Sequence, residues 1–394
     1  MTSLNKKTII YLDNASTTPL SDKAKKEMDN YWNLFYGNPS SLYSLGVKNK
    51  KTLTYCRKMI AECINADTEE IFFTSCGTES DNWALKGTAF KLKEKGNHII
   101  VSAIEHHAIL NTCEFLKKQG FEITYLPVNK FGEVEIPTLQ NAIKKETILI
   151  SIMMVNNEIG TIQNIKELCQ IAHSKNILFH TDAVQAIGHI PVNVKDLDID
   201  MLSCSGHKFN GPKGIGFLYI KKGIEIEPLL NGGQQENNMR AGTENIPLIV
   251  GMATALKEHI EMLTEQILYI NNLRYSLIEQ LKQNGIDFNI NGSNNCVPGI
   301  ISLSFKSIEG ETVLHRLDLK GICVSTGSAC DSKNTQLSHV LKAIHCDKEY
   351  AYGTIRISIS HDNTLDEIIS FVNELTKLIS GNVSKKMNAK DITK

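Results

Sequence analysis

The sequence predicts an α/β fold in which a mostly parallel central sheet is flanked by helices, together with a smaller α+β domain. The first observation is a series of short apolar runs of the length and composition of β-strands. The second is that stretches with apolar residues at helical spacing separate these runs. The third is that the apolar runs are continuous rather than alternating. Continuous runs are typical of strands that are buried on both faces of a parallel sheet.

The strands of the large sheet are predicted from these runs in chain order. They are Ile71–Thr74, His98–Ile104, Ile148–Val155, Ile177–His180, Ile199–Cys204 and Gly216–Ile220, and an earlier strand is predicted at Thr8–Leu12. Helical patterns lie between them at Ser80–Lys95, Ala108–Gln119 and Ile165–Ser174. Strands that alternate with helices of this length indicate βαβ units.

The pattern changes from about Leu256 onward. A long helical stretch reaches Gln283, and two further strands are predicted at Ile300–Phe305 and Thr354–Ser360, with a helix between them. A last amphipathic helix covers Leu365–Ile379, and residues 380–394 form a polar tail. We therefore expect a large domain over residues 14–257. The small domain combines residues 1–13 with residues 258–394.

Composition excludes several classes of protein. The chain has 394 residues, of which 42% are hydrophobic and 22% are charged, so it is neither disordered nor collagen-like. Its 42 Lys and Arg residues nearly balance its 43 Asp and Glu residues, which gives no electrostatic signature of direct nucleic-acid or membrane binding. The polar start, residues 1–7, has no targeting pattern, and no apolar run approaches the ~18 residues of a membrane span. We expect a cytoplasmic protein.

The ten cysteines do not form a recognisable framework. None of them belongs to a C-x-x-C pair, so the usual zinc and thioredoxin-type spacings are missing, and we expect no metal site. In a cytoplasmic protein the thiols stay reduced. Most of these cysteines are expected to be small buried hydrophobic residues.

Polar groups follow five of the predicted strands. Ligands of open α/β sheets bind outside the carboxyl ends of the strands, so these groups are expected to converge on one crevice. They are Ser75–Ser80, Glu105–His107, Asn156–Glu158, Asp182 with Gln185, and Ser205–Lys208.

The residue types in this crevice indicate pyridoxal phosphate (PLP) chemistry. Lys208 follows an apolar strand and lies among glycines, where desolvation would make it a Schiff-base nucleophile. Asp182 is suited to pair with a pyridinium nitrogen, and the helix start at Gly77–Thr78 is suited to phosphate. His106 could stack on the ring, and Gln185 could reach the ring hydroxyl. For Lys208 alone, a solvated surface lysine is the alternative; the combination favours the cofactor site.

With these residues, the sequence resembles the class V, fold-type I PLP enzymes, specifically the NifS/IscS-type cysteine desulfurases. The resemblance covers the chain from Tyr11 to about Leu375. The motifs that carry it are Gly37–Ser41, TSCGTESDN (Thr74–Asn82), Glu105-His106, VNNEIGT (Val155–Thr161), FHTDAVQAIG (Phe179–Gly188), SGHKFNGPKGIG (Ser205–Gly216), RAGTEN (Arg240–Asn245), STGSAC (Ser325–Cys330) and GTIRIS (Gly353–Ser358).

The resemblance implies a role for each matching position. Lys208 would carry the Schiff base and later transfer protons, Asp182 would pair with the pyridine nitrogen, and His106 would stack on the ring. The phosphate would be held by Gly77, Thr78, Ser205 and His207, with Thr243 reaching in from a partner subunit of a homodimer. The ring oxygen and the substrate would be contacted by Gln185, Asn157, Arg356 and Asn14, with Arg356 binding the substrate carboxylate.

Cys330 is the cysteine that differs from the others. It follows the small residues Ser325–Ala329, in a catalytic loop placed at about residues 321–336, where an accessible thiol would be a nucleophile. The resemblance implies that L-cysteine is converted to L-alanine and that its sulfur is left as a persulfide on Cys330. An acceptor protein, either an iron–sulfur scaffold or a tRNA-thiolation enzyme, would then take the sulfur.

Two alternatives and several departures stay open at this point. A selenocysteine lyase shares the fold and most of the site, and a sulfur-carrier or scaffold subunit without turnover would also keep the fold. The chain departs from the family pattern at Gln234, Asn237, Asp331 and His361. Asp331 would raise the pKa of a neighbouring thiol through like-charge repulsion. None of the four replaces a residue that the core chemistry requires.

Overall fold

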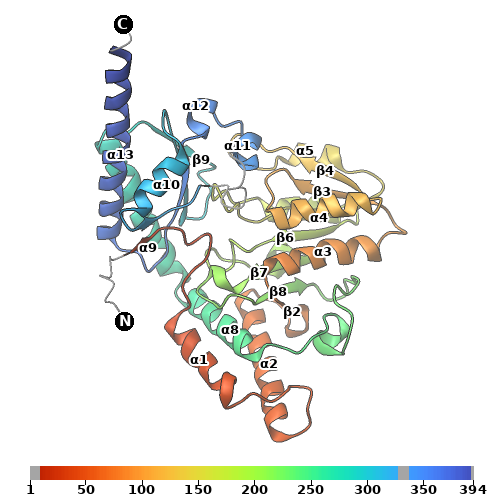
Figure 1. The fold of residues 1–394 in the computed structure, drawn as a ribbon. Helices are drawn as coiled ribbons and strands as arrows, with labels where there is room; N and C mark the ends of the chain where they lie inside the picture. Colours follow the sequence, from red (N-terminus) through yellow and green to blue (C-terminus); the bar gives the residue numbers. More distant parts are fainter. Residues whose placement is uncertain (1–8, 327–336, 392–394) are drawn as a thin grey trace.

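The computed structural model describes residues 9–326 and 337–391, with side chains described as far as residue 381 (Figure 1). Cys330 and most of the predicted catalytic loop lie outside the described residues.

The central sheet of the described chain has seven strands in the order β2-β8-β7-β6-β5-β3-β4. Pairs among β7, β6, β5, β3 and β4 are parallel, whereas β8 runs antiparallel to both of its neighbours. The strands are β2 (Ile71–Thr74), β3 (His98–Ser102), β4 (Glu122–Leu126), β5 (Thr147–Ser151), β6 (Leu178–Asp182), β7 (Met201–Ser205) and β8 (Gly216–Ile220). The parallel strands end at one edge of the sheet, and the polar groups predicted from the sequence follow them there.

Helices cover both faces of this sheet. On one face, α3 (Gly77–Lys91) and α4 (His107–Lys118) pack in a cluster that includes Ile99 and Val101 of β3. On the other face, α2 (Ser44–Cys63), α6 (Ile165–His173) and α8 (Ile246–Glu261) pack in a cluster that includes Ile100 of the same strand. Because neighbouring residues of β3 point to opposite faces, both faces are buried, as the continuous apolar runs predict.

A second sheet organises the C-terminal part of the chain. Its strands are β9 (Phe288–Asn291), β10 (Ile300–Phe305) and β12 (Thr354–Ser358), and β10 lies between the other two. The helices α9 (Leu263–Gln283), α10 (Gly310–Asp318) and α13 (Leu365–Asp391) pack with it around a separate apolar cluster. Figure 1 shows these helices gathered at the end of the molecule opposite α1 and α2.

The start of the chain joins this second unit. β1 (Ile10–Tyr11) pairs in parallel with β11 (Ile322–Cys323), and Leu12 is part of the second unit's apolar cluster. The chain then crosses back to the large sheet through Asn14–Thr18. The division into residues 14–257 on the one hand, and 1–13 with 258–394 on the other, stays a prediction, and this packing is in keeping with it.

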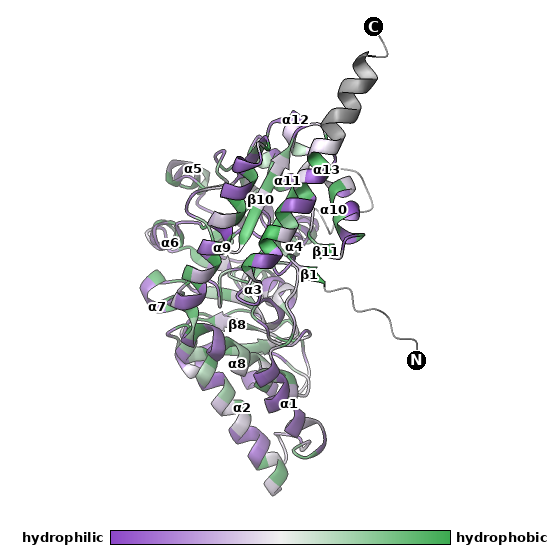
Figure 2. Ribbon diagram, turned by 90° about the vertical axis from the view of Figure 1, so that its left-hand side faces the viewer, coloured by the Kyte–Doolittle hydropathy of each residue, from purple (hydrophilic) through white to green (hydrophobic). Residues whose placement is uncertain are grey.

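Short elements complete the described fold. They are α1 (Asp22–Asn33), η1 (Thr68–Glu70), α5 (Ile136–Ala142), α7 (Val194–Leu197), η2 (Gly206–Lys208), η3 (Gln235–Asn238), α11 (His339–Ala343) and α12 (Lys348–Ala351). In Figure 2, α1 is largely hydrophilic, and it buries only Ala24 and Met28. Across the described residues, no helix combines the length and the apolar character that crossing a membrane requires.

The predicted fold class is confirmed, and the boundaries of several elements differ from the prediction. The helical stretch to Gln283 is divided into α8 and α9 at Met262, whose backbone leaves the helical region (φ −107°, ψ 6°). The edge strand β4 was not predicted, since its partly exposed residues form no continuous apolar run. The last helix continues past Ile379 to Asp391, because no proline interrupts it.

Candidate active site

One cavity of about 310 Å³ collects most of the predicted site residues at the carboxyl ends of β5, β6 and β7. Ten of the predicted residues line it: Gly77, Thr78, His106, Asn157, Asp182, Gln185, Ser205, His207, Lys208 and Arg356. They come from both faces of the sheet edge and from β12 of the second unit. The convergence expected from the strand ends is therefore present in the fold.

Two of the predicted residues that the structure describes do not line this cavity. Asn14 lines a smaller neighbouring cavity of about 30 Å³, together with His189, His259 and His361, and its amide donates to the Ser358 carbonyl at 2.8 Å. Thr243 is exposed away from the cavity of its own chain. Cys330 lies outside the described residues. The roles assigned to these three stay predictions.

Lys208 is held at the end of β7 by the short helical turn η2. Its Nζ donates to the carbonyl oxygens of Ala15 and Ser16, each at 2.8 Å. Its own carbonyl oxygen bonds Nε2 of His189 at 3.0 Å. The Asn14–Thr18 segment therefore covers the lysine and orients its amine at the cavity wall.

Asp182 is the last residue of β6 and is buried at the base of the cavity. Burial raises its pKa to about 6, while the Val184 N–H bond and the charge of Lys208 act in the opposite direction. Val184 N donates to Asp182 Oδ1 at 2.9 Å. At neutral pH the carboxyl group is ionised, which is the state needed to pair with a protonated ring nitrogen.

The amino end of α3 forms an anion cradle beside Ser205 and His207. Gly77 is its first residue, and a Cβ built there would lie 2.6 Å from Cγ2 of Val184 and 3.4 Å from Cβ of Ser205. The backbone therefore approaches the cavity more closely than any other residue type would allow. A helix amino end with free N–H groups and a hydroxyl beside it is suited to a phosphate group. Burial lowers the pKa of His207 to about 4, so this histidine is neutral.

His106 lies at the cavity wall as the N-cap of α4. Its Nδ1 accepts a hydrogen bond from Ala108 N at 3.1 Å, so the proton of the neutral ring lies on Nε2. Burial, followed by the nearby charges of Lys208, His107 and His339, lowers its pKa to about 4. The residue is a neutral ring that offers an Nε2–H donor.

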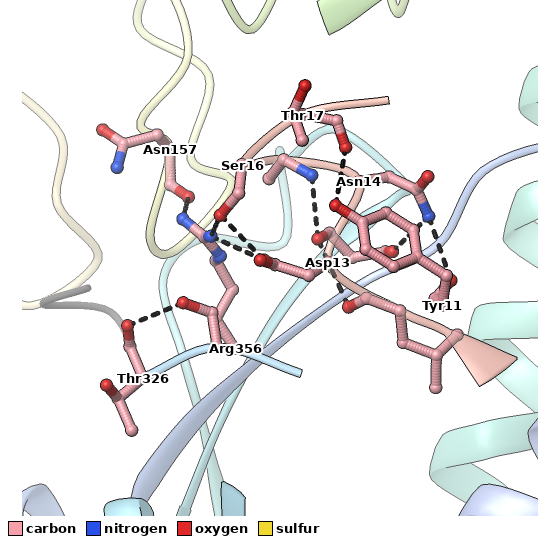
Figure 3. Close-up of polar contacts among 12 residues, drawn as sticks. Tyr11, Asp13, Asn14, Ser16, Thr17, Asn157, Thr326 and Arg356 are labelled. Carbon is pink, nitrogen blue, oxygen red and sulfur yellow. Dashed lines mark hydrogen bonds and ion pairs between the residues drawn. The ribbon is translucent and has the colours of Figure 1, made fainter. Parts of the chain in front are cut away.

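Arg356 reaches the cavity from β12 and is fixed by three groups (Figure 3). Its Nη2 donates to Oδ1 of Asp13 at 2.9 Å and to Oγ of Ser16 at 2.6 Å, and its Nη1 donates to the Asn157 carbonyl at 2.9 Å. Its Nε has no hydrogen-bond partner within the described residues although it is buried. The guanidinium is thus held in place with a donor still unused.

The lining contains residues that sequence reasoning did not single out as site residues. They include Asp81 and His339, together with Ser16, which contacts Arg356. Asp81 lies four residues after Gly77 on α3, so helical spacing places both on one face. That spacing was the available signal for Asp81. His339 begins α11, far along the chain, and no local pattern marks it.

Unpaired buried groups test whether these residues fit PLP. The described chain has six buried side-chain atoms without a hydrogen-bond partner, and three belong to the cavity lining: Asp81 Oδ1, Ser205 Oγ and Arg356 Nε. Buried polar atoms are normally paired, so orphaned atoms around one cavity indicate a bound group. The residues present fit each part of PLP. A lysine amine fits the aldehyde, a buried aspartate fits the ring nitrogen, and an unpaired hydroxyl beside a glycine cradle fits the phosphate. An arginine fits the carboxylate of the substrate. Among the described residues, no group of three or more His, Cys, Asp or Glu is arranged to hold a metal ion.

Comparison with known proteins agrees with this site. The aminotransferase class-V family model matches residues 10–371. Cysteine desulfurase IscS of Methanosarcina thermophila is 49% identical over 372 residues, covering 93% of this chain and 92% of the relative. Cysteine desulfurase IscS of Dictyoglomus turgidum is 48% identical over 371 residues, covering 94% of each chain.

Solved structures give the same result. A NifS-like protein superposes with a TM-score of 0.90 at 38% identity, covering 95% of this chain and all of that one (100%). SspA in complex with cysteine superposes with a TM-score of 0.80 at 36% identity, covering 89% of this chain and 99% of that one. The chain therefore belongs to the aminotransferase class-V family and, within it, to the PLP-dependent cysteine desulfurases of the NifS/IscS type.

Proposed function

We propose that the protein removes sulfur from L-cysteine, releases L-alanine and passes the sulfur through Cys330 to an acceptor protein. The observation that supports this most directly is the cavity that brings Lys208, Asp182, His106 and Arg356 together. Each of these residue types has several ordinary structural uses. Their arrangement around one cavity at the strand ends matches the parts of a PLP site and a carboxylate site.

The residues of this chain would hold PLP at both ends of its ring. Lys208 would bind it covalently through Nζ after leaving the Ala15 and Ser16 carbonyls, and Asp182 would face the ring nitrogen as an anion. Gly77, Thr78, Ser205 and His207 would bind the phosphate, and His106 would stack on the ring. Gln185 donates its Nε2–H to the Ala15 carbonyl at 2.8 Å, which leaves its oxygen as the group available to the ring hydroxyl. Bound PLP supplies the electron sink that makes the Cα proton of the amino acid acidic.

Arg356 and Asn157 would orient the substrate. A carboxylate can accept either from the unused Nε–H or from the remaining Nη1 proton of a guanidinium that Asp13 and Ser16 already fix. Asn157 lines the same cavity and contacts Arg356 through its backbone carbonyl, whereas its side-chain amide points away from the guanidinium in Figure 3. In this proposal the substrate amino group faces Lys208. Asn14 supports this region through the Ser358 strand, and a direct contact of Asn14 with substrate is part of the proposal.

Lys208 and His106 would divide the proton handling. The Lys208 amine would be the base that takes the Cα proton and returns it to carbon. His106 offers Nε2–H because Ala108 N occupies its other nitrogen. It therefore acts as a hydrogen-bond donor to a developing sulfur or carboxylate anion.

The sulfur step would use Cys330. Its thiolate attacks the substrate sulfur, so an S–S bond forms while the substrate C–S bond breaks. The electron pair of that bond stays with Cβ, which takes a proton and becomes the methyl group of alanine. Sulfur is oxidised by two electrons and carbon is reduced by two, so no outside oxidant is required. We place Thr243 at the phosphate of a partner subunit in a homodimer, and an iron–sulfur scaffold or tRNA-thiolation enzyme as the sulfur acceptor.

Two variants test this proposal. Lys208→Ala should abolish the visible absorbance of PLP bound as a Schiff base and reduce alanine formation by several orders of magnitude. Cys330→Ala should keep that absorbance and lose persulfide formation and sulfide release, whereas Cys296→Ala should retain both activities as a control thiol.

The measurements are the absorption spectrum and the parallel assay of alanine and sulfide from L-cysteine. Full sulfide release by Cys330→Ala contradicts the persulfide route. If that variant still releases selenide from selenocysteine while the wild type prefers selenocysteine to cysteine, the selenocysteine lyase alternative holds.

A further inference from the structure

A second buried carboxyl group lies at the cavity beside Asp182 and has no part in the proposed chemistry. Asp81 is on α3, one helical turn after Gly77, and only 1% of it is exposed. It lines the same cavity as Asp182. Its Oδ1 is buried without a hydrogen-bond partner in the described part of the chain. A carboxyl group in such a place needs a physical explanation, since an unpaired buried charge is very costly.

His180 does not neutralise Asp81. Nε2 of His180 lies 3.8 Å from Asp81 Oδ1, beyond hydrogen-bond distance. The two ring nitrogens of His180 already bond Oγ of Ser151 at 2.8 Å and Oγ of Ser203 at 2.9 Å. Burial lowers the pKa of His180 to about 3, so the ring is neutral at every physiological pH. Asp81 therefore has no counter-ion on β6.

The other titratable groups that face Asp81 have the wrong sign. Burial disfavours a negative charge on Asp81 more than any neighbouring group does, and the carboxylate of Asp182 on β6 adds like-charge repulsion. Glu105 before α4 and Cys76 act in the same direction when they are ionised. The Ser203 hydroxyl on β7 acts the other way and is outweighed, so the pKa of Asp81 lies well above its usual value.

The anion of Asp182 is better stabilised than the anion of Asp81. It accepts the Val184 N–H at 2.9 Å, and the positive charge of Lys208 acts on it. Two neighbouring buried carboxyl groups disfavour ionisation of each other, and the proton stays on the group with the poorer stabilisation of its anion. In this cavity the group with the poorer stabilisation is Asp81.

We propose that Asp81 and Asp182 form a carboxyl pair that holds one proton at neutral pH, with the proton on Asp81, so that Asp182 remains the anion of the cavity. Asp81 is thus a positioning residue, which acts through Asp182 rather than on the reacting atoms. Its use in the reaction rests on the proposed function, in which Asp182 faces the ring nitrogen. The placement of the proton itself is a property of the protein with or without PLP.

The first test detects the proton directly in the full chain. The infrared difference spectrum between wild type and Asp81→Asn, at neutral pH without PLP, should contain the C=O stretch of one protonated carboxyl. Glu105, whose pKa burial raises to about 8, contributes equally to both proteins and cancels. The exposed Asp29→Asn serves as the matched control and should give no such band. In an Asp182→Asn background, the Asp81 band should disappear at a lower pH than in wild type, because the repulsion is gone.

The second test measures stability against pH. An unfolded Asp ionises above about pH 4, whereas folded Asp81 keeps its proton. The contribution of Asp81 to the stability of the wild type therefore falls as pH rises through this window, and Asp81→Asn lacks this contribution. The folding constant of Asp81→Asn divided by that of the wild type should grow by up to tenfold for each unit that the pH rises. Denaturant unfolding without PLP measures both constants. A ratio that is flat with pH, or a difference spectrum without a protonated-carboxyl band, overturns the proposal.

A labelled wild-type protein covers the case in which Asp81→Asn does not fold. Carbon-13 NMR of protein labelled at the aspartate carboxyl carbon should show one aspartate still protonated at pH 7.5, and finding none overturns the proposal. None of these measurements uses catalysis. A failed carboxyl pair is therefore distinguishable from a failed Lys208 or Cys330 assignment.

Discussion

Gly77 connects the two ends of the cofactor cavity through the side chain of Val184. A Cβ at position 77 would meet Cγ2 of Val184 at 2.6 Å, and Val184 in turn holds Asp182 through its N–H. Val184 is short and branched, so it has no flexible end that could move aside. A side chain at position 77 would therefore disturb both the anion cradle and the carboxylate.

Gly77→Ala should weaken PLP binding while leaving the fold intact. The expected overpacking cost is about 1–3 kcal/mol, which corresponds to roughly tenfold or more in the dissociation constant of PLP. Titration of the PLP-free protein with PLP, followed by absorbance, measures it. Gly381→Ala is the matched control, because a Cβ at position 381 in α13 meets no other atom within 4 Å. Equal PLP affinity of Gly77→Ala and Gly381→Ala would show that Gly77 is not needed to form the anion cradle.

At the residue scale, the sequence predicts those site residues that directly follow a strand. Lys208, Asp182 and His106 belong to short motifs next to apolar runs, and all three line the cavity. Asp81 and His339 could not be predicted to the same degree. The importance of Asp81 comes from its burial beside Asp182, and that of His339 from a contact between distant parts of the chain in which its Nε2 bonds the Glu105 carbonyl at 3.0 Å.

Among the helices and loops, a buried ion pair ties α2 to the loop that carries Thr243. The Arg57 guanidinium binds both carboxylate oxygens of Glu236 at 2.6 Å, and Phe73 N donates to the same carboxylate at 2.9 Å. Glu236 is in the left-handed region (φ 46°), as are Asn237 and Asn238 after it. Three consecutive residues in that region are unfavourable, so the ion pair offsets local strain in this loop.

Glu236→Ala should destabilise the protein by about 3 kcal/mol, because it leaves the Arg57 charge and the Phe73 N–H unpaired in the interior. Denaturant unfolding measures the effect. The control is Glu62→Ala on α2, the helix that carries Arg57. It removes an exposed ion pair with Lys58 and should lower the free energy of unfolding by less than about 0.5 kcal/mol. A similar loss of unfolding free energy in the two variants would show that the buried Arg57–Glu236 pair stabilises the protein no more than an exposed pair does.

Element prediction from the sequence succeeds where burial produces a continuous pattern. Strands β2, β8 and β10 begin and end where the apolar runs do, because both faces of these strands are buried. The half-exposed edge strand β4 lacks that pattern. The left-handed loop at Asn237 could not be predicted either. The sequence shows there only a departure from the family pattern, while the conformation depends on Arg57, which is far away in the chain.

At the scale of the whole molecule, several buried or partly buried histidines in the described part of the chain stay neutral. Burial is the largest cause that lowers the pKa of five of them to about 3 or 4: His106, His180, His189, His207 and His259. Once unfolded, each would titrate near pH 6.5. The unfolded chain therefore binds more protons than the folded one between about pH 4 and 6.5, and acid favours unfolding. Three buried carboxyls with raised pKa values, Asp81, Glu105 and Asp182, act in the opposite direction and are outnumbered.

Acidification from about pH 6.5 to 4.5 should therefore lower the folding equilibrium constant of the PLP-free protein by more than tenfold. His259→Gln should make this dependence shallower by up to tenfold per pH unit, whatever its effect on stability at neutral pH. The exposed His315→Gln should leave the slope unchanged. Urea unfolding at several pH values provides the test. Parallel curves for His259→Gln and wild type would contradict it.

The pairing of the first strand with β11 has a consequence for the order in which the protein is made. Asp13 and Arg356 are 343 residues apart in the chain, yet their contact fixes the guanidinium at the cavity. The ribosome therefore releases the strand that begins the chain long before its partners exist, and the large sheet with Lys208 is synthesised in the meantime. The first strand can pair with β11 only after the second unit has been synthesised. Until the segment around position 356 has been made, a nascent chain therefore holds Lys208 without the Asp13–Arg356 contact at the cavity.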